Sequence, residues 1–224
     1  MARLVNTRPL EFLGVTTDIR FRQFIGASLA LILLLPFINF LMEWNAGWVF
    51  PESLDSLESR LREWEDSAAD TTSMILGSSS VGALISGILV IGVLTGLAEE
   101  SFFRAGMQRA LVSSGVNHHL SIILIAILFS AFHFQFYGFV PRFILGALFG
   151  YLYYYTHSLW VSAFAHALNN SLVVVTAWVA ANGGDISIFE SIDTTGAVWP
   201  LASLILFTLF VLFLWRPLLH KPSR

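Results

Sequence analysis

The stretch 143–184, FILGALFGYLYYYTHSLWVSAFAHALNNSLVVVTAWVAANGG, decides the fold class because it contains no Asp, Glu, Lys or Arg. A transmembrane helix needs roughly 20 mostly apolar residues, so this stretch is too long for one span. It fits two spans joined by a tight turn, which we expect at Thr156-His157-Ser158. Trp160, directly after this turn, is typical of a membrane interface. The stretch therefore predicts two antiparallel membrane helices.

Four more stretches lack charged residues, at 23–42, 71–98, 110–141 and 194–215. Together they predict an all-α, polytopic membrane protein built as a bundle of about six transmembrane helices. Of the 224 residues, 56% are hydrophobic and only 12% are charged, against about 25% charged residues in an average soluble domain. This composition excludes an ordinary soluble enzyme and a disordered chain. Strands of a membrane barrel would be short alternating segments, unlike these long apolar runs.

The charges predict the orientation of the bundle and its partners. Lys and Arg gather near both termini and after the second span, so the positive-inside rule places both termini in the cytoplasm. Arg142 is the exception, on the opposite side. The net charge of −3 gives no sign of a nucleic-acid partner, and the expected partner is the lipid bilayer. The absence of cysteine excludes disulfides, thiolate metal sites and a cysteine nucleophile.

We divide residues 1–224 as a single membrane domain with four parts. These are an N-terminal segment with the first span (1–44), an acidic extramembrane segment (45–70), a core (75–180), and the last span with a basic tail (195–224). The acidic segment has apolar residues spaced three and four apart, with acids between them: Leu54, Leu57, Leu61 and Trp64. This pattern predicts an amphipathic helix over 51–68 that lies on the outer membrane surface, between spans 1 and 2.

Several polar side chains lie within or at the ends of the predicted spans, where each ionisable group costs about 2.5–3.5 kcal/mol. They are Glu99, Glu100, His133, His166 and Asn170. The segment 113–117, Ser-Ser-Gly-Val-Asn, is a turn signal. Glu99 and His133 lie at equal sequence distance on either side of Val116, so an antiparallel hairpin puts them at one depth. His166 differs from His133 by about 4–5 Å in depth at the helical rise, so three spans can place polar groups in one layer.

Two pairs of these residues are spaced i,i+4 and share a helix face. Glu100 and Arg104 form the first pair, so the guanidinium can neutralise one of the two acids. Adjacent carboxylates in a poorly solvated place cannot both ionise cheaply, and pairing one leaves the other free for acid–base chemistry. His166 and Asn170 form the second pair, and both can donate hydrogen bonds into the space facing Glu99.

Three motifs occur in order: Glu99-Glu100-x-x-x-Arg104, Phe129-x-x-x-His133 and His166-x-x-x-Asn170. With Ser158-Leu159-Trp160, this pattern resembles the CPBP family, which comprises CAAX prenyl proteases of the second type, bacteriocin-processing enzymes and the Abi group. The resemblance covers about residues 80–175. It implies an intramembrane endopeptidase of the glutamate type that needs no cofactor and no metal. Because many members of the family are bacterial, the expected location is the bacterial inner membrane.

The resemblance also implies a function for each motif residue. Glu99 would be the general base that activates a water, and His133 would orient that water. Glu100 and Arg104 would hold the base in place, while His166 and Asn170 would stabilise the oxyanion of the tetrahedral intermediate. Such a site would act on a peptide or protein substrate, which can be anchored in the membrane. The natural substrate, its lipidation, and the choice between Glu99 and Glu100 as base stay open.

Three other interpretations of the same residues stay open. A zinc metallopeptidase could use His133, His166 and one Glu as ligands, but no H-E-x-x-H pair is present and Arg104 would oppose a dication. A membrane scaffold or immunity protein would keep the fold without catalysis, although the intact polar residues argue against it. A proton-coupled transporter would use the same acids, but no internal repeat is visible.

Overall fold

The computed structural model describes residues 9–15, 19–186 and 198–215, and all regular elements within these ranges are helices. Most of the basic terminal residues on which the predicted orientation depends lie outside them. The elements, in chain order, are α2 (Pro9–Phe12), α3 (Phe21–Ala46), η1 (Glu52–Leu54), α4 (Asp55–Leu76), α5 (Val81–Gly87), η2 (Ile88–Leu94), α6 (Thr95–Glu100), η3 (Ser101–Gln108), α7 (Arg109–Ser113), α8 (His118–Ala131), η4 (Phe136–Gly138), α9 (Phe139–Thr156), α10 (Leu159–Ala181) and α12 (Val198–Phe213).

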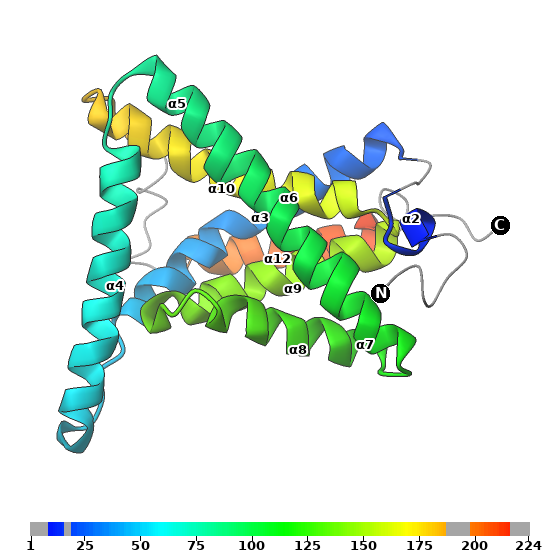
Figure 1. Cartoon of the computed structure of the whole chain (residues 1–224), viewed down its shortest axis with the longest axis horizontal. Coiled ribbons are helices and arrows are strands. Elements are labelled where there is room, and N and C mark those ends of the chain that lie inside the picture. Colours follow the sequence, from blue (N-terminus) through cyan, green and yellow to red (C-terminus); the bar gives the residue numbers. More distant parts are fainter. Residues whose placement is uncertain (1–8, 16–18, 187–197, 216–224) are drawn as a thin grey trace.

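Four helical stretches are long and apolar enough to cross a membrane: Phe21–Ala46, Val81–Ser113, Phe136–Thr156 and Leu159–Ala181. The second is one continuous helix, α5 to α7, that contains the two π-helical segments η2 and η3. Two shorter apolar helices, α8 and α12, pack with them (Figure 1). The predicted all-helical fold is thus confirmed for the described residues, with four helices long and apolar enough to span a membrane. The total of six spans stays a prediction, because α8 and α12 are shorter than a typical span.

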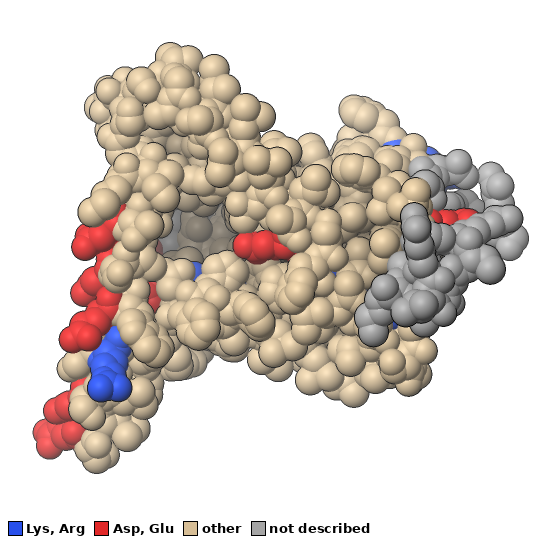
Figure 2. Space-filling view, in the orientation of Figure 1, with Lys and Arg blue, Asp and Glu red and all other residues tan. Residues whose placement is uncertain are grey.

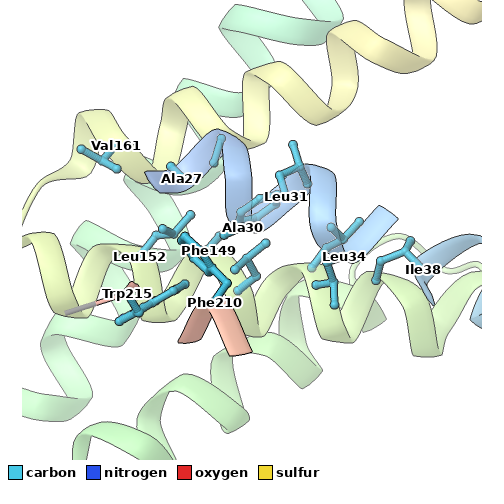
Figure 3. Packing of buried hydrophobic residues seen from close by; sticks show 13 residues of the cluster. Ala27, Ala30, Leu31, Leu34, Ile38, Phe149, Leu152, Val161, Phe210 and Trp215 are labelled. Carbon is cyan, nitrogen blue, oxygen red and sulfur yellow. The ribbon is translucent and has the colours of Figure 1, made fainter. Parts of the chain in front are cut away.

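The core forms where α3 meets α9, α10 and α12. Ala27 and Leu31 of α3 pack with Phe149 of α9, Val161 of α10 and Phe210 of α12 (Figure 3). These side chains are almost completely buried. Many Leu, Ile, Val and Phe side chains on the outer faces of the helices are instead exposed. Such an outer surface suits a lipid environment, in which apolar groups carry no hydration cost.

Two predicted turns are confirmed. Gly115, at φ 91°, lies in the turn before α8, and the Asn117 side chain caps α8 by accepting the backbone N–H of His119 at 2.8 Å. His157, at φ 53°, ends α9 in the left-handed conformation and is followed by α10. Both hairpins therefore form where short polar segments interrupt the apolar runs.

Two predicted span boundaries are wrong. The expected span 71–98 is divided, because α4 continues to Leu76 and a new helix begins at Val81 after the Ser80 N-cap. This helix continues past Glu99, because the charged side chains that follow are paired inside the protein. The expected span 110–141 is also divided, since α8 ends at Ala131 and the chain turns before η4. A stretch without charged residues indicates an apolar segment, but it does not indicate whether that segment forms one continuous helix.

Helix α4 stands apart and crosses one end of the bundle (Figure 1). It extends over Asp55–Leu76 instead of ending at residue 68, and Leu76 is its only buried residue. It contacts η4, α5 and α10. Figure 2 shows acidic side chains along the outer side of α4 and a hollow between this helix and the bundle. Its amphipathic placement on a membrane surface stays a prediction.

Candidate active site

Close contact between two helices positions the acidic motif. Gly96 lies against α10 so tightly that a Cβ atom there would be 2.9 Å from the backbone nitrogen of Ala167. Gly87 and Gly92 face the same helix, at Val174 and Ser171 respectively. The hydrogen bonds of a π-helix join residues i and i+5, so η2 lets two glycines five residues apart share one face. The backbone of the α5–α7 helix can therefore approach α10 along several turns.

Glu100 lies inside this contact and is completely buried. Its Oε2 accepts a hydrogen bond from Nε of Arg104 at 2.9 Å and another from the Ser162 hydroxyl. Its Oε1 lies 3.0 Å from Nδ1 of His166. Arg104 is also fully buried, and its guanidinium lies over the Phe129 ring at 5.4 Å. This carboxylate is therefore surrounded by donors and by one fixed positive charge, which confirms the predicted Glu100–Arg104 contact.

Glu99, one residue earlier, has a different environment. Its side chain is 28% exposed, and its Oε2 accepts no hydrogen bond from any group that the structure describes. Nε2 of His166 lies 3.8 Å from this oxygen. Glu99 lines a pocket of about 250 Å³ together with His133, Phe102, Phe103 and Phe132. The free carboxylate thus faces a small aromatic pocket.

His133 also lines this pocket, as the predicted depth match requires, but it does not lie within a span. It follows the end of α8, in the turn 132–135. Its Nδ1 lies 2.8 Å from the carbonyl oxygen of Phe129. A carbonyl only accepts, so Nδ1 carries the hydrogen and Nε2 is the atom left for a substrate or a water.

His166 is fixed from several sides. Its ring stacks on Phe149 with centroids 4.7 Å apart and planes at 14°, and it meets Phe129 edge-on at 5.7 Å. Because the Glu100 carboxylate is the partner of Nδ1, that nitrogen donates, and the Nε2 side of the ring is directed to Glu99. The ring thus lies between the fully buried acid, Glu100, and the partly buried one, Glu99.

Asn170 lies one turn beyond His166 and differs from the expected arrangement. Its Nδ2 donates to the backbone oxygen of Ile91 at 3.1 Å, and its Oδ1 accepts from Asn169 at 3.3 Å. Ile91 belongs to the π-helical segment η2 and lies about two turns before Glu99. One hydrogen of the Asn170 carboxamide is therefore used to hold the two helices together.

The structure brings five of the six predicted residues around one place: Glu99, Glu100, Arg104, His133 and His166. Sequence reasoning missed Ser162 and Phe149. Ser162 could have been found, because it precedes His166 by four residues and so lies on the same helix face. Phe149 gives no such signal, since one aromatic residue among many in α9 does not reveal its contact with α10.

The ionisable groups do not form an evident metal site. Among the residues that the structure describes, no group of three or more His, Asp or Glu side chains is placed to hold a metal ion. Both histidines have Nδ1 engaged by an oxygen acceptor, and the Arg104 guanidinium occupies the side of Glu100 where a cation would bind. The arrangement instead offers one free carboxylate beside two imidazoles.

Comparison with known families agrees with this geometry. Residues 81–172 match the family model described as type II CAAX prenyl endopeptidase Rce1-like. Over these residues the chain is similar to the type II CAAX prenyl endopeptidases. The matched region contains every motif residue discussed above, and the family is one of proteases, which are hydrolases. With the four long apolar helices, it indicates an integral membrane protein. Comparisons with curated proteins and with solved structures gave no significant match.

Proposed function

We propose that this CAAX-type protease is a glutamate-dependent intramembrane endopeptidase in which Glu99 is the general base. The observation that carries this proposal is the contrast between two adjacent acids. Glu100 is neutralised by Arg104 and held by Ser162 and His166, whereas Oε2 of Glu99 has no hydrogen-bond partner within the described residues. A general base must be within reach of the proton it removes, and Glu99 is the acid whose side chain lines the pocket.

These positions support the following reaction as part of the proposal. Glu99 removes a proton from a water that His133 orients, and the resulting hydroxide attacks the carbonyl carbon of the scissile peptide bond. His166, whose Nε2 lies 3.8 Å from Oε2 of Glu99 and must carry a hydrogen in this step in addition to the one on Nδ1, stabilises the oxyanion of the tetrahedral intermediate, and the second amide hydrogen of Asn170 is the other proposed donor. Glu99 then passes its proton to the leaving amine, so the peptide bond breaks and the carboxylate is restored.

The pocket also suggests the substrate class. Phe102, Phe103 and Phe132 line it with Glu99 and His133, so an apolar side chain next to the scissile bond would fit. We propose a peptide or protein substrate that reaches the site from the membrane, and a prenyl group is one of several anchors compatible with this surface.

The test is cleavage of peptide libraries by the purified protein in detergent, with unmodified and lipidated peptides, in water enriched in oxygen-18. We expect the wild-type protein to cleave and to leave one heavy oxygen in the new carboxylate, and Glu99→Gln to leave the peptides intact. We also expect cleavage to survive prolonged treatment with a strong chelator.

Three results would contradict this mechanism. Loss of activity on chelation with recovery on addition of zinc would make His133 and His166 metal ligands. Wild-type turnover by Glu99→Gln would remove Glu99 as the base. No cleavage of any library by the wild-type protein would favour a non-catalytic membrane protein that keeps the fold.

A further inference from the structure

The turn that carries His133 has an unusual backbone. Phe134 has φ 54°, in the left-handed region that bulky side chains rarely adopt. Such a conformation costs about 1–3 kcal/mol and persists only where the surrounding structure holds it. The Phe134 side chain is 69% exposed, and its ring meets that of Trp64 edge-on with centroids 6.4 Å apart. Contacts other than the packing of Phe134 must therefore hold this turn.

A single carboxylate on α4 accepts two hydrogen bonds from the next residues of the turn. Oε1 of Glu65 accepts from Nε2 of Gln135 at 3.1 Å, and Oε2 accepts from the backbone N–H of Tyr137 at 3.2 Å. Glu65 lies 70 residues before Gln135 in the sequence. The two bonds therefore fix the chain directly after His133 to a helix outside the bundle.

Arg142 of α9 holds Gln135 from the other side. Its Nη1 donates to Oε1 of Gln135 and its Nη2 to the backbone oxygen of Gln135, both at 2.7 Å. The Gln135 carboxamide thus lies between the Glu65 carboxylate, to which its nitrogen donates, and the Arg142 guanidinium, from which its oxygen accepts. Gly138 leaves the space for this arrangement, because a Cβ atom there would collide with the Arg142 guanidinium. The network explains why an arginine occupies position 142, although the positive-inside rule does not favour a positive charge there.

The position of this turn matters to the site because His133 lines two adjacent cavities. One is the 250 Å³ pocket that contains Glu99. The other, about 520 Å³, lies between the turn and α4 and is lined by Trp64, Ser67, Ala68, Thr71, Thr72, His133 and Phe134. Figure 2 shows the corresponding side of the molecule, hollowed beside α4. A shift of the turn would therefore change both the place of His133 and the opening towards Glu99.

We propose that Glu65 is a positioning residue that fixes the His133 turn through Gln135, and that Arg142 completes the clamp. The helix outside the bundle thereby determines where His133 faces Glu99. The kinetic consequence rests on the proposed function, whereas the clamp itself is a statement about the turn. A displacement of a catalytic group by about 1 Å can cost up to about 10²-fold in rate, which sets the scale of the expected effect.

The kinetic test compares Glu65→Ala with Glu63→Ala, because Glu63 is an exposed acid on the same helix. Glu65→Ala should lower kcat by roughly tenfold to a hundredfold with KM nearly unchanged, and Glu63→Ala should behave as wild type. Glu65→Gln keeps one acceptor oxygen for two donors and should recover part of kcat. Wild-type kcat in Glu65→Ala, or an equal loss in Glu63→Ala, would overturn the proposal.

Hydrogen–deuterium exchange of the same purified proteins tests the clamp without activity. Glu65→Ala should speed exchange in peptides covering 132–138, where the Tyr137 N–H loses its acceptor, and leave α8 unchanged. Unchanged exchange in that segment would refute the clamp even if kcat fell. If the wild-type protein cleaved nothing, the proposed function would fail, while faster exchange confined to 132–138 would still establish the clamp.

Discussion

Glu99 and Glu100 are the same residue type and adjacent in α6, but their side chains have very different surroundings. Successive residues of a helix point about 100° apart, since 3.6 residues make one turn. Glu100 therefore faces α10, where Arg104, Ser162 and His166 surround it, and Glu99 faces the pocket beside His133. One carboxylate is tied into the helix packing, and its neighbour is left with a free oxygen. The difference shows that two adjacent acids on one helix turn can have opposite surroundings, and the proposed function makes the acid with the free oxygen the general base.

A second contrast sharpens the first. Arg62–Glu58 on α4 and Arg104–Glu100 have the same i,i+4 spacing, with N–O distances of 2.7 Å and 2.9 Å. The Arg62 side chain is 46% exposed, whereas both partners of the second pair are fully buried. Water screens an exposed pair, while a buried charge depends on its partner. The same local spacing therefore has different consequences in the two regions.

Replacing Glu99, the proposed general base, should cause the largest loss of activity. Glu99→Gln keeps the shape of the side chain but removes the base, and general-base catalysis contributes up to about 10⁴-fold. We expect turnover to fall by about that factor while the melting temperature stays close to that of the wild type. Peptide cleavage and thermal unfolding in detergent would measure the two quantities. Wild-type turnover by Glu99→Gln would contradict its role as base. A melting temperature of Glu99→Gln as low as that of Glu100→Gln would show that the two acids do not differ in their contribution to stability.

Loss of the buried guanidinium should come next. Arg104→Ala leaves Glu100 buried without its positive partner, which typically costs about 3–5 kcal/mol. We expect a marked drop in melting temperature and, through displacement of His166, a loss of activity. Arg62→Ala is the matched control and should melt close to the wild type. Changing both partners, Glu100→Gln with Arg104→Met, should recover part of the stability, because no unpaired charge then remains. Equal effects of Arg104→Ala and Arg62→Ala would show that burial does not separate the two pairs.

The oxyanion donors should give the smallest of the three effects and should differ from each other. His166→Ala should lower kcat by roughly 10²–10³ with little change in KM, as loss of one oxyanion donor does. Asn170→Ala should lower kcat less and reduce stability as well, because it also frees the Ile91 carbonyl. If both residues serve one oxyanion, the double variant should lose less than the product of the single losses. A change in KM alone would assign both residues to substrate binding.

Much of the site was predictable because it depends on local spacing. The i,i+4 rule predicted the Glu100–Arg104 contact, and the turn at 113–117 predicted that Glu99 and His133 meet. Apolar runs of sufficient length predicted an all-helical membrane protein, since backbone groups in lipid must be satisfied within the segment. The matching family, over residues 81–172, was indicated by the three ordered motifs.

The remainder was not predictable, because it depends on contacts between residues distant in sequence. No local rule places the His133 turn between Glu65 and Arg142, or directs Asn170 to the carbonyl of Ile91. The absence of charged residues also could not predict the helix break after Leu76 or the end of α8 at Ala131.

The sequence by itself determined which residues can do the chemistry, because residue type, helical period and apolar length are properties of the local chain. The i,i+4 spacing already indicated Glu100 as the acid that Arg104 neutralises. The tertiary structure added the other surroundings of the two acids, because Ser162, His166 and the His133 turn arrive from other segments. Burial and hydrogen bonding are set by the assembled helices, so the full contrast between the surroundings of Glu99 and Glu100 arises only in the fold.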